Sequence, residues 1–339
     1  MISAVPALSA FPMSCRSTVP CNLCQGTEVD VVGTRDRDGR PLRTVLCRGC
    51  GLVWTDPRPS SDQTREFYAH EYRVKYKSID SPKPKHAYRE TLRAITRIRE
   101  LSEITRPGQK FLDIGAGGGF FVYALQRAGF DACGLEPNQG YADYARSVLQ
   151  VPVQNAFLQD VEFEPRSFDV ITLIHVLEHL EDPAGALQRL AGWLRPEGYL
   201  VVEVPNIESR HHSPERRYHI GHLYHFNLRT LAGIGQKAGL DLFESRLLNG
   251  PRHCHVIFQK PEVPSRVLPD FKSVYNARRV SRALQQHTVL SHYLSPAIYL
   301  RVLKKNLRCM EEWQQTFGQR NARLIVDNVV RKTAENNLL

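Results

Sequence analysis

Four of the eight cysteines stand in two pairs whose spacing suits a single metal ion. Cys21 and Cys24 form one Cys-x-x-Cys pair, and Cys47 and Cys50 form another after 22 intervening residues. Each pair can place two thiolates on one ion, and two pairs complete the tetrahedral set that zinc prefers. A site with four protein ligands is closed to substrate, so we expect a structural Zn2+ that this small segment needs in order to fold. Two redox-active pairs are the alternative, which the lack of a thioredoxin-like βαβ pattern around either pair disfavours.

A glycine-rich segment near the middle of the chain has the composition of a ligand-binding turn. Asp113, Gly115 and Gly117 belong to the sequence Asp-Ile-Gly-Ala-Gly-Gly-Gly-Phe, which follows an expected strand at Lys110–Ile114 and opens a helix. Glycines allow a sharp turn and a close approach to a ligand, and the start of a helix offers amide donors. Glu136 ends the next expected strand, where a carboxylate can accept hydrogen bonds from both ribose hydroxyls of an adenosine group.

The details of this turn favour S-adenosylmethionine over a dinucleotide. The dinucleotide fingerprint requires Gly or Ala three residues after its second glycine, and Phe120 stands there. Asp113, two residues before the first glycine, would repel a pyrophosphate but attract an amino group. S-adenosylmethionine has an amino acid end, a sulfonium and no phosphate, so it suits both observations. A glycine turn without a ligand is the alternative.

Another set of candidate residues matches a zinc-protease pattern. His175, Glu178 and His179 form the sequence His-x-x-Glu-His, in which two histidines four apart on a helix hold zinc and the glutamate acts as base. The motif directly follows a buried strand expected at 169–174, and this context disfavours a protease. We expect Glu178 and His179 to shape the mouth of a substrate site. A helix start with buried polar contacts is the alternative.

The elements that must position these residues alternate between strand and helix. Alternation with short connections predicts an α/β fold with a doubly wound, mostly parallel sheet. Two further strands, at 240–247 and 255–259, are separated by about seven residues, too few for a crossover helix, so they must pair as antiparallel neighbours. The remaining expected strands are Lys110–Ile114, 132–135, 169–174 and 199–204. The expected helices between them are 120–128, 141–148 and 184–194.

Taken together, these motifs resemble those of class I S-adenosylmethionine-dependent methyltransferases. Residues 111–120 are similar to motif I of that family, 134–138 to its ribose-binding motif, 167–183 to its fourth strand with the following loop, and 194–206 to its fifth strand. The resemblance implies a Rossmann-like sheet of seven strands with an antiparallel last strand. It assigns six residues to the cofactor: Asp113, Gly115 and Gly117 at the methionine end, Glu136 at the ribose, Asn155 at the adenine and His175 at the methyl region.

The N-terminal segment has a family resemblance of its own. Residues 47–59, with Phe67, Tyr68 and Tyr72, resemble zinc-ribbon methyltransferases related to the sugar C-methyltransferases of deoxysugar biosynthesis. With this resemblance we expect a disordered start at 1–14 and a zinc ribbon at 15–57. A helical connector at 58–106 then leads to the methyltransferase domain at 107–260, and a basic helical extension follows at 261–339.

A histidine-rich segment follows the fifth strand, at the edge of the sheet where ligands bind. Residues 221–226, Gly-His-Leu-Tyr-His-Phe, resemble a segment of the same family in which histidines and a tyrosine face substrate. Methyl transfer is an in-line displacement that needs alignment, and an oxygen or carbon nucleophile must also lose a proton. We therefore hypothesise that His225 or His222 is the general base and that Tyr224 positions substrate. A second metal site built from His219, His222 and His225 is one alternative, and plain packing is another.

The formal charge of +10 is concentrated in the two flanks of the chain. It is about +6 before Pro107, −3 over 107–260 and +7 after Lys260. Basic flanks attract nucleic acid, phosphorylated substrates or anionic membranes, or they form solvated helical faces. No apolar run is long enough to span a membrane and the first residues lack a basic leader, so we expect a cytoplasmic protein.

Three functions follow from these patterns. The leading one is methylation of a small molecule, such as a sugar, a glycan or a natural-product intermediate, at oxygen or carbon. The second is methylation of ribosomal or other RNA through the ribbon and the basic flanks, which the lack of an aromatic-rich basic stretch disfavours. The third is a non-catalytic binding protein that keeps the fold. For the helical extension at 261–339 we expect that it caps the core, binds a partner or forms a homo-oligomer.

Overall fold

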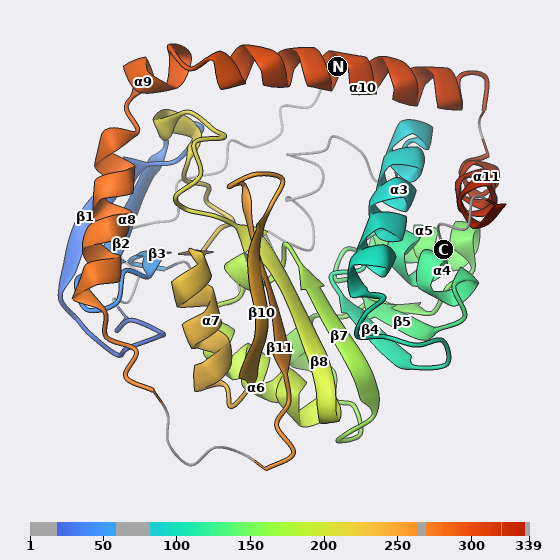
Figure 1. Ribbon diagram of the computed structural model, residues 1–339, viewed down its shortest axis with the longest axis horizontal. Coiled ribbons are helices and arrows are strands. Elements are labelled where there is room, and N and C mark those ends of the chain that lie inside the picture. The colour runs from blue at the N-terminus through green and yellow to red at the C-terminus, as the bar shows by residue number, and fades with distance from the viewer. Residues whose placement is uncertain (1–18, 59–81, 264–268, 320, 336–339) are drawn as a thin grey trace, which may run out of the picture.

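The computed structural model (Figure 1) describes four stretches of the chain: 19–58, 82–263, 269–319 and 321–335. The expected disordered start at 1–14 lies outside the described residues, as do residues 59–81 of the expected helical connector. None of the helices in the described stretches is long and apolar enough to cross a membrane.

A large sheet of seven strands forms the centre of the molecule, in the order β10-β11-β8-β7-β4-β5-β6. β11 runs antiparallel to both of its neighbours, β8 and β10, and the other pairs are parallel. The predicted doubly wound sheet with an antiparallel last strand is therefore confirmed. The strands are β4 (Lys110–Ile114), β5 (Asp131–Leu135), β6 (Val153–Gln154), β7 (Phe168–Ile174), β8 (Leu194–Pro205), β10 (Asp241–Leu248) and β11 (His253–Gln259).

Helices cover both faces of this sheet, because its central strands are apolar on both sides. In β7, Val170 packs into the core beneath one set of helices and the adjacent Ile171 packs into the core on the opposite face. Successive side chains of a strand point to opposite faces, so a continuous apolar run needs two covers. One cover is formed by α3 (Pro84–Leu101), α4 (Phe120–Arg127) and α11 (Ala322–Glu335), and the other by α6 (Pro183–Trp193) and α7 (Leu228–Lys237).

A second, smaller sheet contains the N-terminal strands and one strand from far along the chain. β1 (Val29–Arg35), β2 (Pro41–Cys47) and β3 (Val53–Thr55) pair in sequence order, and β9 (Tyr224–His225) pairs antiparallel with β3. The helix α8 (Val274–Gln286) packs over β2 (Figure 1). The ribbon segment is thus joined to the histidine-rich segment by backbone pairing, which the sequence did not indicate.

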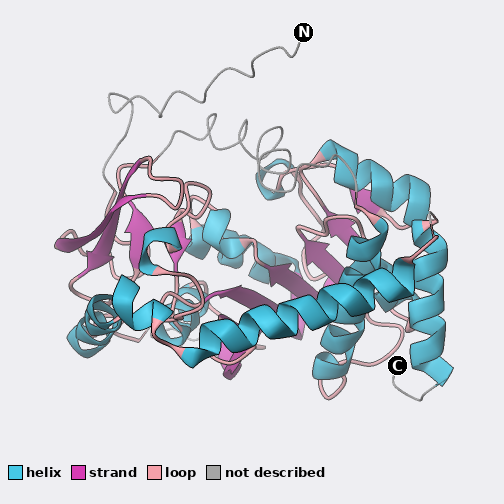
Figure 2. Ribbon diagram, turned by 90° about the horizontal axis from the view of Figure 1, so that it is seen from above, coloured by secondary structure: helices cyan, strands magenta, loops and turns pink. Residues whose placement is uncertain are grey.

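The C-terminal extension is helical, as predicted, and it arches over the sheet. After α9 (Val289–Tyr293), the long helix α10 (Pro296–Thr316) runs from the side of the small sheet to the helices beside the large sheet (Figures 1 and 2). Its far end is tied to α3, where the guanidinium of Arg89 donates from Nε to Oε1 of the buried Glu312 at 2.6 Å.

Three local expectations were wrong. The two prolines between Ser78 and Lys85 predict a loop there, but α3 begins at Pro84, because proline suits the first turn of a helix. The helix expected at 141–148 is α5 (Gln139–Tyr144) followed by a π-helical turn (Ala145–Leu149). The His-x-x-Glu-His motif is not helical at its start: His175 has a φ of 57°, and only a short 3-10 turn (Leu177–His179) follows.

Candidate active site

The glycine loop joins β4 to α4 at the carboxyl edge of the large sheet. Gly115 has a φ of 78°, and a Cβ added there would lie 2.4 Å from Cγ2 of Val176. Gly117 also has a positive φ, 56°, and its amide donates to Oε2 of Glu136 at 2.8 Å. Backbone conformation at both positions, and space at Gly115, therefore require glycine.

Asp113 lies at the base of this loop and is almost completely buried. Its Oδ1 accepts a hydrogen bond from Oγ1 of Thr172 at 2.6 Å. Among the described residues it forms no ion pair. Burial raises the pKa of Asp113 to about 6, although the bond from Thr172 opposes the shift. A cationic amino group placed here would meet a carboxyl that has no strong counter-charge.

Glu136 follows β5 directly, and its carboxylate faces the glycine loop. Besides the amide of Gly117, the backbone amide of Asn138 donates to its Oε1 at 3.0 Å. Asn155 lies beside it, and its Nδ2 donates to the backbone oxygens of Glu136 at 2.9 Å and Pro137 at 3.0 Å. The structure thus brings Asp113, the two glycines, Glu136 and Asn155 to one edge of adjacent strands.

His175, at the end of β7, belongs to a different group of polar side chains. Its Nε2 lies 3.3 Å from Oε1 of Glu203, and its Nδ1 lies 3.6 Å from Oε1 of Glu178. The same Oε1 of Glu203 lies 2.9 Å from Nδ1 of His253. Burial acts against protonation of His175, but the two carboxylates outweigh it and raise its pKa to about 9. His175 is therefore a cation at neutral pH.

His179 and His222 lie beside the buried carboxylate of Glu178. The Nδ1 of His179 donates to the backbone oxygen of Gly221 at 2.7 Å, because a carbonyl only accepts, and Nε2 lies 3.8 Å from Oε1 of Glu178. The ring of His222 lies 4.8 Å from that of His179. Glu178, His179 and His222 each offer one potential metal ligand, and these three atoms lie within 4.8 Å of one another. This set differs from the alternative metal site of His219, His222 and His225.

His222 is the centre of this group. Its ring lies 4.9 Å from that of His219 and 6.0 Å from that of His225. Burial and the neighbouring histidines, His179 first, lower the pKa of His222 well below its usual value. It is half-buried, whereas His225 is only 6 % exposed. Burial lowers the pKa of His225 to about 4, and its Nε2 has no hydrogen-bond partner among the described residues.

Tyr224 occupies a position that its predicted role did not anticipate. It is completely buried in β9, where it pairs with Trp54 of the small sheet. The guanidinium of Arg58 stacks on its ring at 4.6 Å and donates to its hydroxyl, which donates in turn to the backbone oxygen of Glu181 at 3.3 Å. The hydroxyl is thus already engaged with protein groups.

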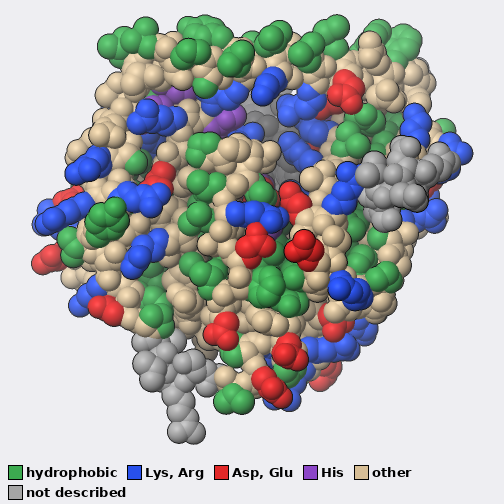
Figure 3. All heavy atoms as spheres, in the orientation of Figure 1, with side chains coloured by type: hydrophobic (Ala, Val, Ile, Leu, Met, Phe, Trp, Pro, Cys, Tyr) green, Lys and Arg blue, Asp and Glu red, His purple; other side chains and the backbone are tan. Residues whose placement is uncertain are grey.

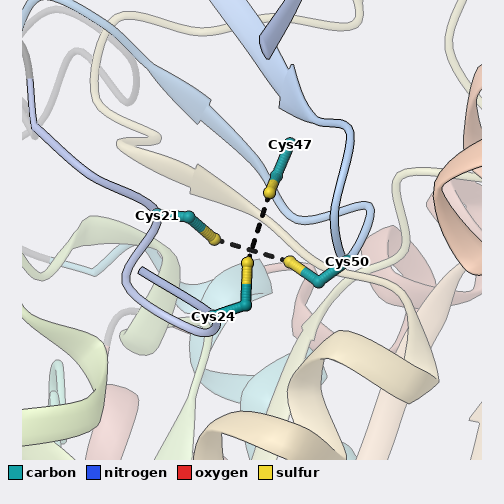
Figure 4. A group of neighbouring side chains, drawn as sticks. All are labelled: Cys21, Cys24, Cys47 and Cys50. Atoms are coloured by element: carbon teal, nitrogen blue, oxygen red, sulfur yellow. Dashed lines mark hydrogen bonds between the residues drawn. The ribbon is translucent and has the colours of Figure 1, made fainter. Parts of the chain in front are cut away.

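The four paired cysteines converge at one end of the small sheet (Figure 4). The Sγ atoms of Cys21 and Cys50 are 3.4 Å apart, and those of Cys24 and Cys47 are also 3.4 Å apart. All four lie within 4.8 Å of one another and none is in a disulfide. Tetrahedral zinc with Zn–S bonds of about 2.3 Å requires sulfurs roughly 3.8 Å apart, so the donor set fits the ion.

Sequence reasoning missed Glu203, His253 and Arg58. Glu203 stands among apolar residues inside a strand. A single acid in such an apolar run indicates a buried partner, and this is the sequence pattern that could have identified it. His253 follows a hairpin turn, and its role depends on the antiparallel pairing of β11 with β8. Arg58 reaches Tyr224 across 166 positions of sequence, so no local pattern marks it.

Comparison with known proteins agrees with this geometry. Residues 85–245 match the family model described as a methyltransferase domain. A ubiquinone biosynthesis O-methyltransferase of Alkalilimnicola ehrlichii is 33% identical over 106 residues, which are 29% of this chain and 42% of that protein. One from Xanthomonas campestris pv. campestris is 31% identical over 111 residues, 31% of this chain and 46% of that protein. The chain thus spans less than half the length of these curated relatives.

Solved structures of the same class are also similar to the chain. An S-adenosylmethionine-dependent methyltransferase from Mesorhizobium loti has 15% sequence identity and a TM-score of 0.42, and the match covers 48% of this chain and 96% of that one. The match of residues 85–245 to the methyltransferase-domain model agrees with the resemblance stated from motif I and the ribose-binding motif.

Proposed function

We propose that the chain is an S-adenosylmethionine-dependent methyltransferase that modifies an oxygen or carbon atom of a small molecule. The observation that carries this proposal is the placement of Asp113 and Glu136 at the carboxyl ends of the adjacent strands β4 and β5, with Gly117 of the glycine loop bonded to Glu136. A buried carboxyl suits the amino group of the cofactor, and the second acid suits its ribose. The names of the curated relatives, which are O-methyltransferases, support an oxygen nucleophile.

The residues present suit S-adenosylmethionine better than a phosphate-bearing cofactor. Gly115 lets the loop pack closely against Val176, which follows β7, because a Cβ at this position would clash with that side chain. Asp113 and Glu136 would hold the methionine and ribose ends, and Asn155 stands beside the ribose position. When bound, S-adenosylmethionine supplies an electrophilic methyl group on its sulfonium.

The chemistry of this chain's own residues is proton removal and alignment. We assign the general base to His222, because it is half-buried, lies at the centre of the histidine group and has a pKa low enough to stay neutral at pH 7. The more deeply buried ring of His225 lies 6.0 Å from that of His222. His179, which is held by Gly221 and Glu178, orients the ring of His222. His175 is held as a cation by Glu178 and Glu203, so it orients and does not accept the proton.

The cysteine cluster would hold a structural Zn2+ through Cys21, Cys24, Cys47 and Cys50. Four convergent thiols leave no open ligand position, which supports a structural and not a catalytic ion. The metal would keep β3 in place beside β9, and thereby position His225.

A methyl-transfer assay with radiolabelled S-adenosylmethionine tests the proposal against its alternatives. We expect binding of the cofactor by calorimetry and transfer to members of a panel of sugars, nucleotide sugars, glycans and phenolic natural products. Transfer to RNA, with binding that weakens steeply with salt, would establish the RNA alternative instead. Failure to bind S-adenosylmethionine would contradict the proposal and favour a non-catalytic binding protein.

A further inference from the structure

A hollow lies between α10 and the carboxyl edge of the large sheet, and basic side chains gather around it (Figure 3). The hairpin that joins β10 to β11 reaches this edge, because His253 at the start of β11 pairs with Pro205 at the end of β8. Arg252, the last residue of the hairpin turn, is half-buried. Among the described residues its side chain makes no hydrogen bond and no ion pair.

Other arginines surround Arg252 from two further elements. Burial and the nearby Arg93 of α3, together with Arg308 and Arg301 of α10, lower the pKa of Arg252. Arg93 pairs with Glu90 at 2.8 Å, and Arg308 lies 3.4 Å from the buried Glu312.

Arg301 has no acidic partner within the described part of the chain. Its Nη1 donates to the backbone oxygen of His211 at 2.7 Å and also lies 2.9 Å from Nδ1 of that residue. Burial, followed by the charge of Arg252, lowers the pKa of His211 to about 3 and that of His212 to about 4, so both rings are neutral. Within the described part of the chain, neither guanidinium group is therefore bound to a carboxylate, although the charge of Glu203 acts on Arg252.

We propose that Arg252 and Arg301 bind a phosphate or diphosphate group of a soluble acceptor substrate in the hollow beneath α10. This inference rests on the proposed function and names its substrate class. Uncompensated guanidinium groups offer forked donors that match phosphate oxygens. Arg252 is adjacent in sequence to His253, which contacts Glu203, and Glu203 contacts His175 at the methyl region. The phosphate would thus be bound near His175 but not at the methyl group, and the remainder of the acceptor would extend from the phosphate to the methyl group.

Calorimetric titration with inorganic pyrophosphate and with uridine diphosphate tests this site. We expect both to bind the full-length protein, and Arg252→Gln or Arg301→Gln to weaken binding by about 10-fold or more. Arg282→Gln is the matched control, since it removes an equal charge from the exposed side of α8, and it should change neither affinity. S-adenosylmethionine should bind all four proteins equally.

Each contrary outcome has a distinct meaning. No binding of either probe to the unmodified protein, or equal weakening by Arg282→Gln, overturns the anion site. Binding to vesicles of phosphatidylglycerol without binding of the soluble probes also overturns it, because the source of phosphate would then be a lipid surface. If pyrophosphate binds and S-adenosylmethionine does not, the anion site stands and the proposed methyltransferase function fails.

The outer side of α10 carries an independent inference. Leu300, Leu303, Leu307, Met310 and Phe317 are each more than half exposed, and Figure 3 shows the apolar row along the top of the molecule. Their spacing of three and four residues is that of a coiled-coil seam. Monomeric proteins rarely expose a contiguous apolar surface of more than a few hundred Å2.

We infer that a second copy of this chain covers this side of α10 through an antiparallel, two-fold contact. That arrangement sets Leu307 against Met310 of the second copy and brings Lys304 beside Glu311 of the second copy, so the contact is self-complementary in charge. Glu311 also accepts a hydrogen bond at 3.3 Å from the hydroxyl of Tyr88 on α3, which leaves its second carboxylate oxygen for the lysine. The strongly basic side of the helix, with Arg301 and Arg308, faces the opposite direction. An anionic membrane is therefore a poorer occupant, because it would need those charges beside the apolar row.

Analytical ultracentrifugation of the full-length protein tests this contact. We expect a dimer for the unmodified chain and a monomer for Leu307→Glu. Lys304→Glu should weaken the dimer, and adding Glu311→Lys should restore it. A monomeric unmodified chain, or a dimer that Leu307→Glu leaves intact, would overturn the inference, and so would vesicle binding by a monomer.

Discussion

The two halves of the candidate site are built in opposite ways. The cofactor half consists of the glycine loop, Asp113 and Glu136, which lie on two adjacent parallel strands within 24 positions of sequence. The histidine half brings together Glu178, His222 and groups from several separate elements. Its one strand, β9, pairs with the ribbon and not with the large sheet.

Because the two halves are built differently, we expect cofactor binding and catalytic turnover to respond to different changes in the protein. Contacts of Glu136 within the cofactor half are short-range and involve backbone groups, and the bond from Thr172 to Asp113 comes from a neighbouring strand of the same sheet, so these contacts should survive changes in the ribbon. The histidine half depends on the ribbon, which in turn depends on its cysteines. Damage to the cofactor half should therefore appear as lost affinity for S-adenosylmethionine, and damage to the histidine half as lost turnover.

Removal of zinc is expected to have the largest effect and to be confined to the histidine half. Without the metal the small ribbon loses its fold, β9 loses its partner β3, and the histidines are displaced. Turnover should fall by about two orders of magnitude or more, since small displacements of reacting groups are that costly. Affinity for S-adenosylmethionine should change by less than about twofold, within the usual scatter of surface changes.

Dialysis against a chelator and the variant Cys50→Ser both produce this state, with metal content, turnover and calorimetry as readouts. Cys309→Ser, an exposed cysteine outside the cluster, is the control and should retain metal and turnover. An equal loss of cofactor affinity in Cys50→Ser would show that the two halves are not separable.

Replacement of the proposed base should have the next largest effect. His222→Ala is expected to lower kcat by roughly 10²–10⁴-fold while cofactor affinity is retained, because general base catalysis contributes about that much. His212→Ala, which changes an exposed histidine of the same connecting segment, serves as the control. If His225→Ala lowers kcat by more than His222→Ala does, with the fold intact by circular dichroism, the base is His225 and our assignment is wrong.

Glu136→Gln tests the cofactor half from the other direction. The change keeps the shape of the side chain but weakens its bonds to ribose hydroxyls, so we expect about 10-fold to 100-fold weaker binding of S-adenosylmethionine. At saturating cofactor, kcat should be nearly unchanged. Asp131→Asn, at the exposed start of the same strand, is the matched control. A fall in kcat at saturation would mean that Glu136 also aligns the methyl group.

The contrast between the halves also explains what the sequence predicts and what it does not. The strand β4, the loop at Gly115 and the acid at Glu136 follow from local composition, because the bond between Gly117 and Glu136 spans only 19 positions. The antiparallel pairing of β10 and β11 follows from a short connection. The pairing of Trp54 with Tyr224, and the contact of Glu203 with His253, depend on packing between distant segments. No periodicity or spacing reports such contacts.

The smallest predicted effect is a pH dependence that only the cofactor half should show. Because burial raises the pKa of Asp113 to about 6, its carboxyl is charged at pH 7 and largely protonated at pH 5. Affinity for S-adenosylmethionine, whose amino group stays cationic over this range, should therefore fall about tenfold from pH 7 to pH 5. Asp113→Asn should bind weakly at both pH values and lose the dependence. If the variant keeps the slope, the titrating group is elsewhere, and the histidines of the other half become the candidates. That result would mean that the two halves share charge across the strands β4 and β7, and the separation of binding from chemistry would not hold.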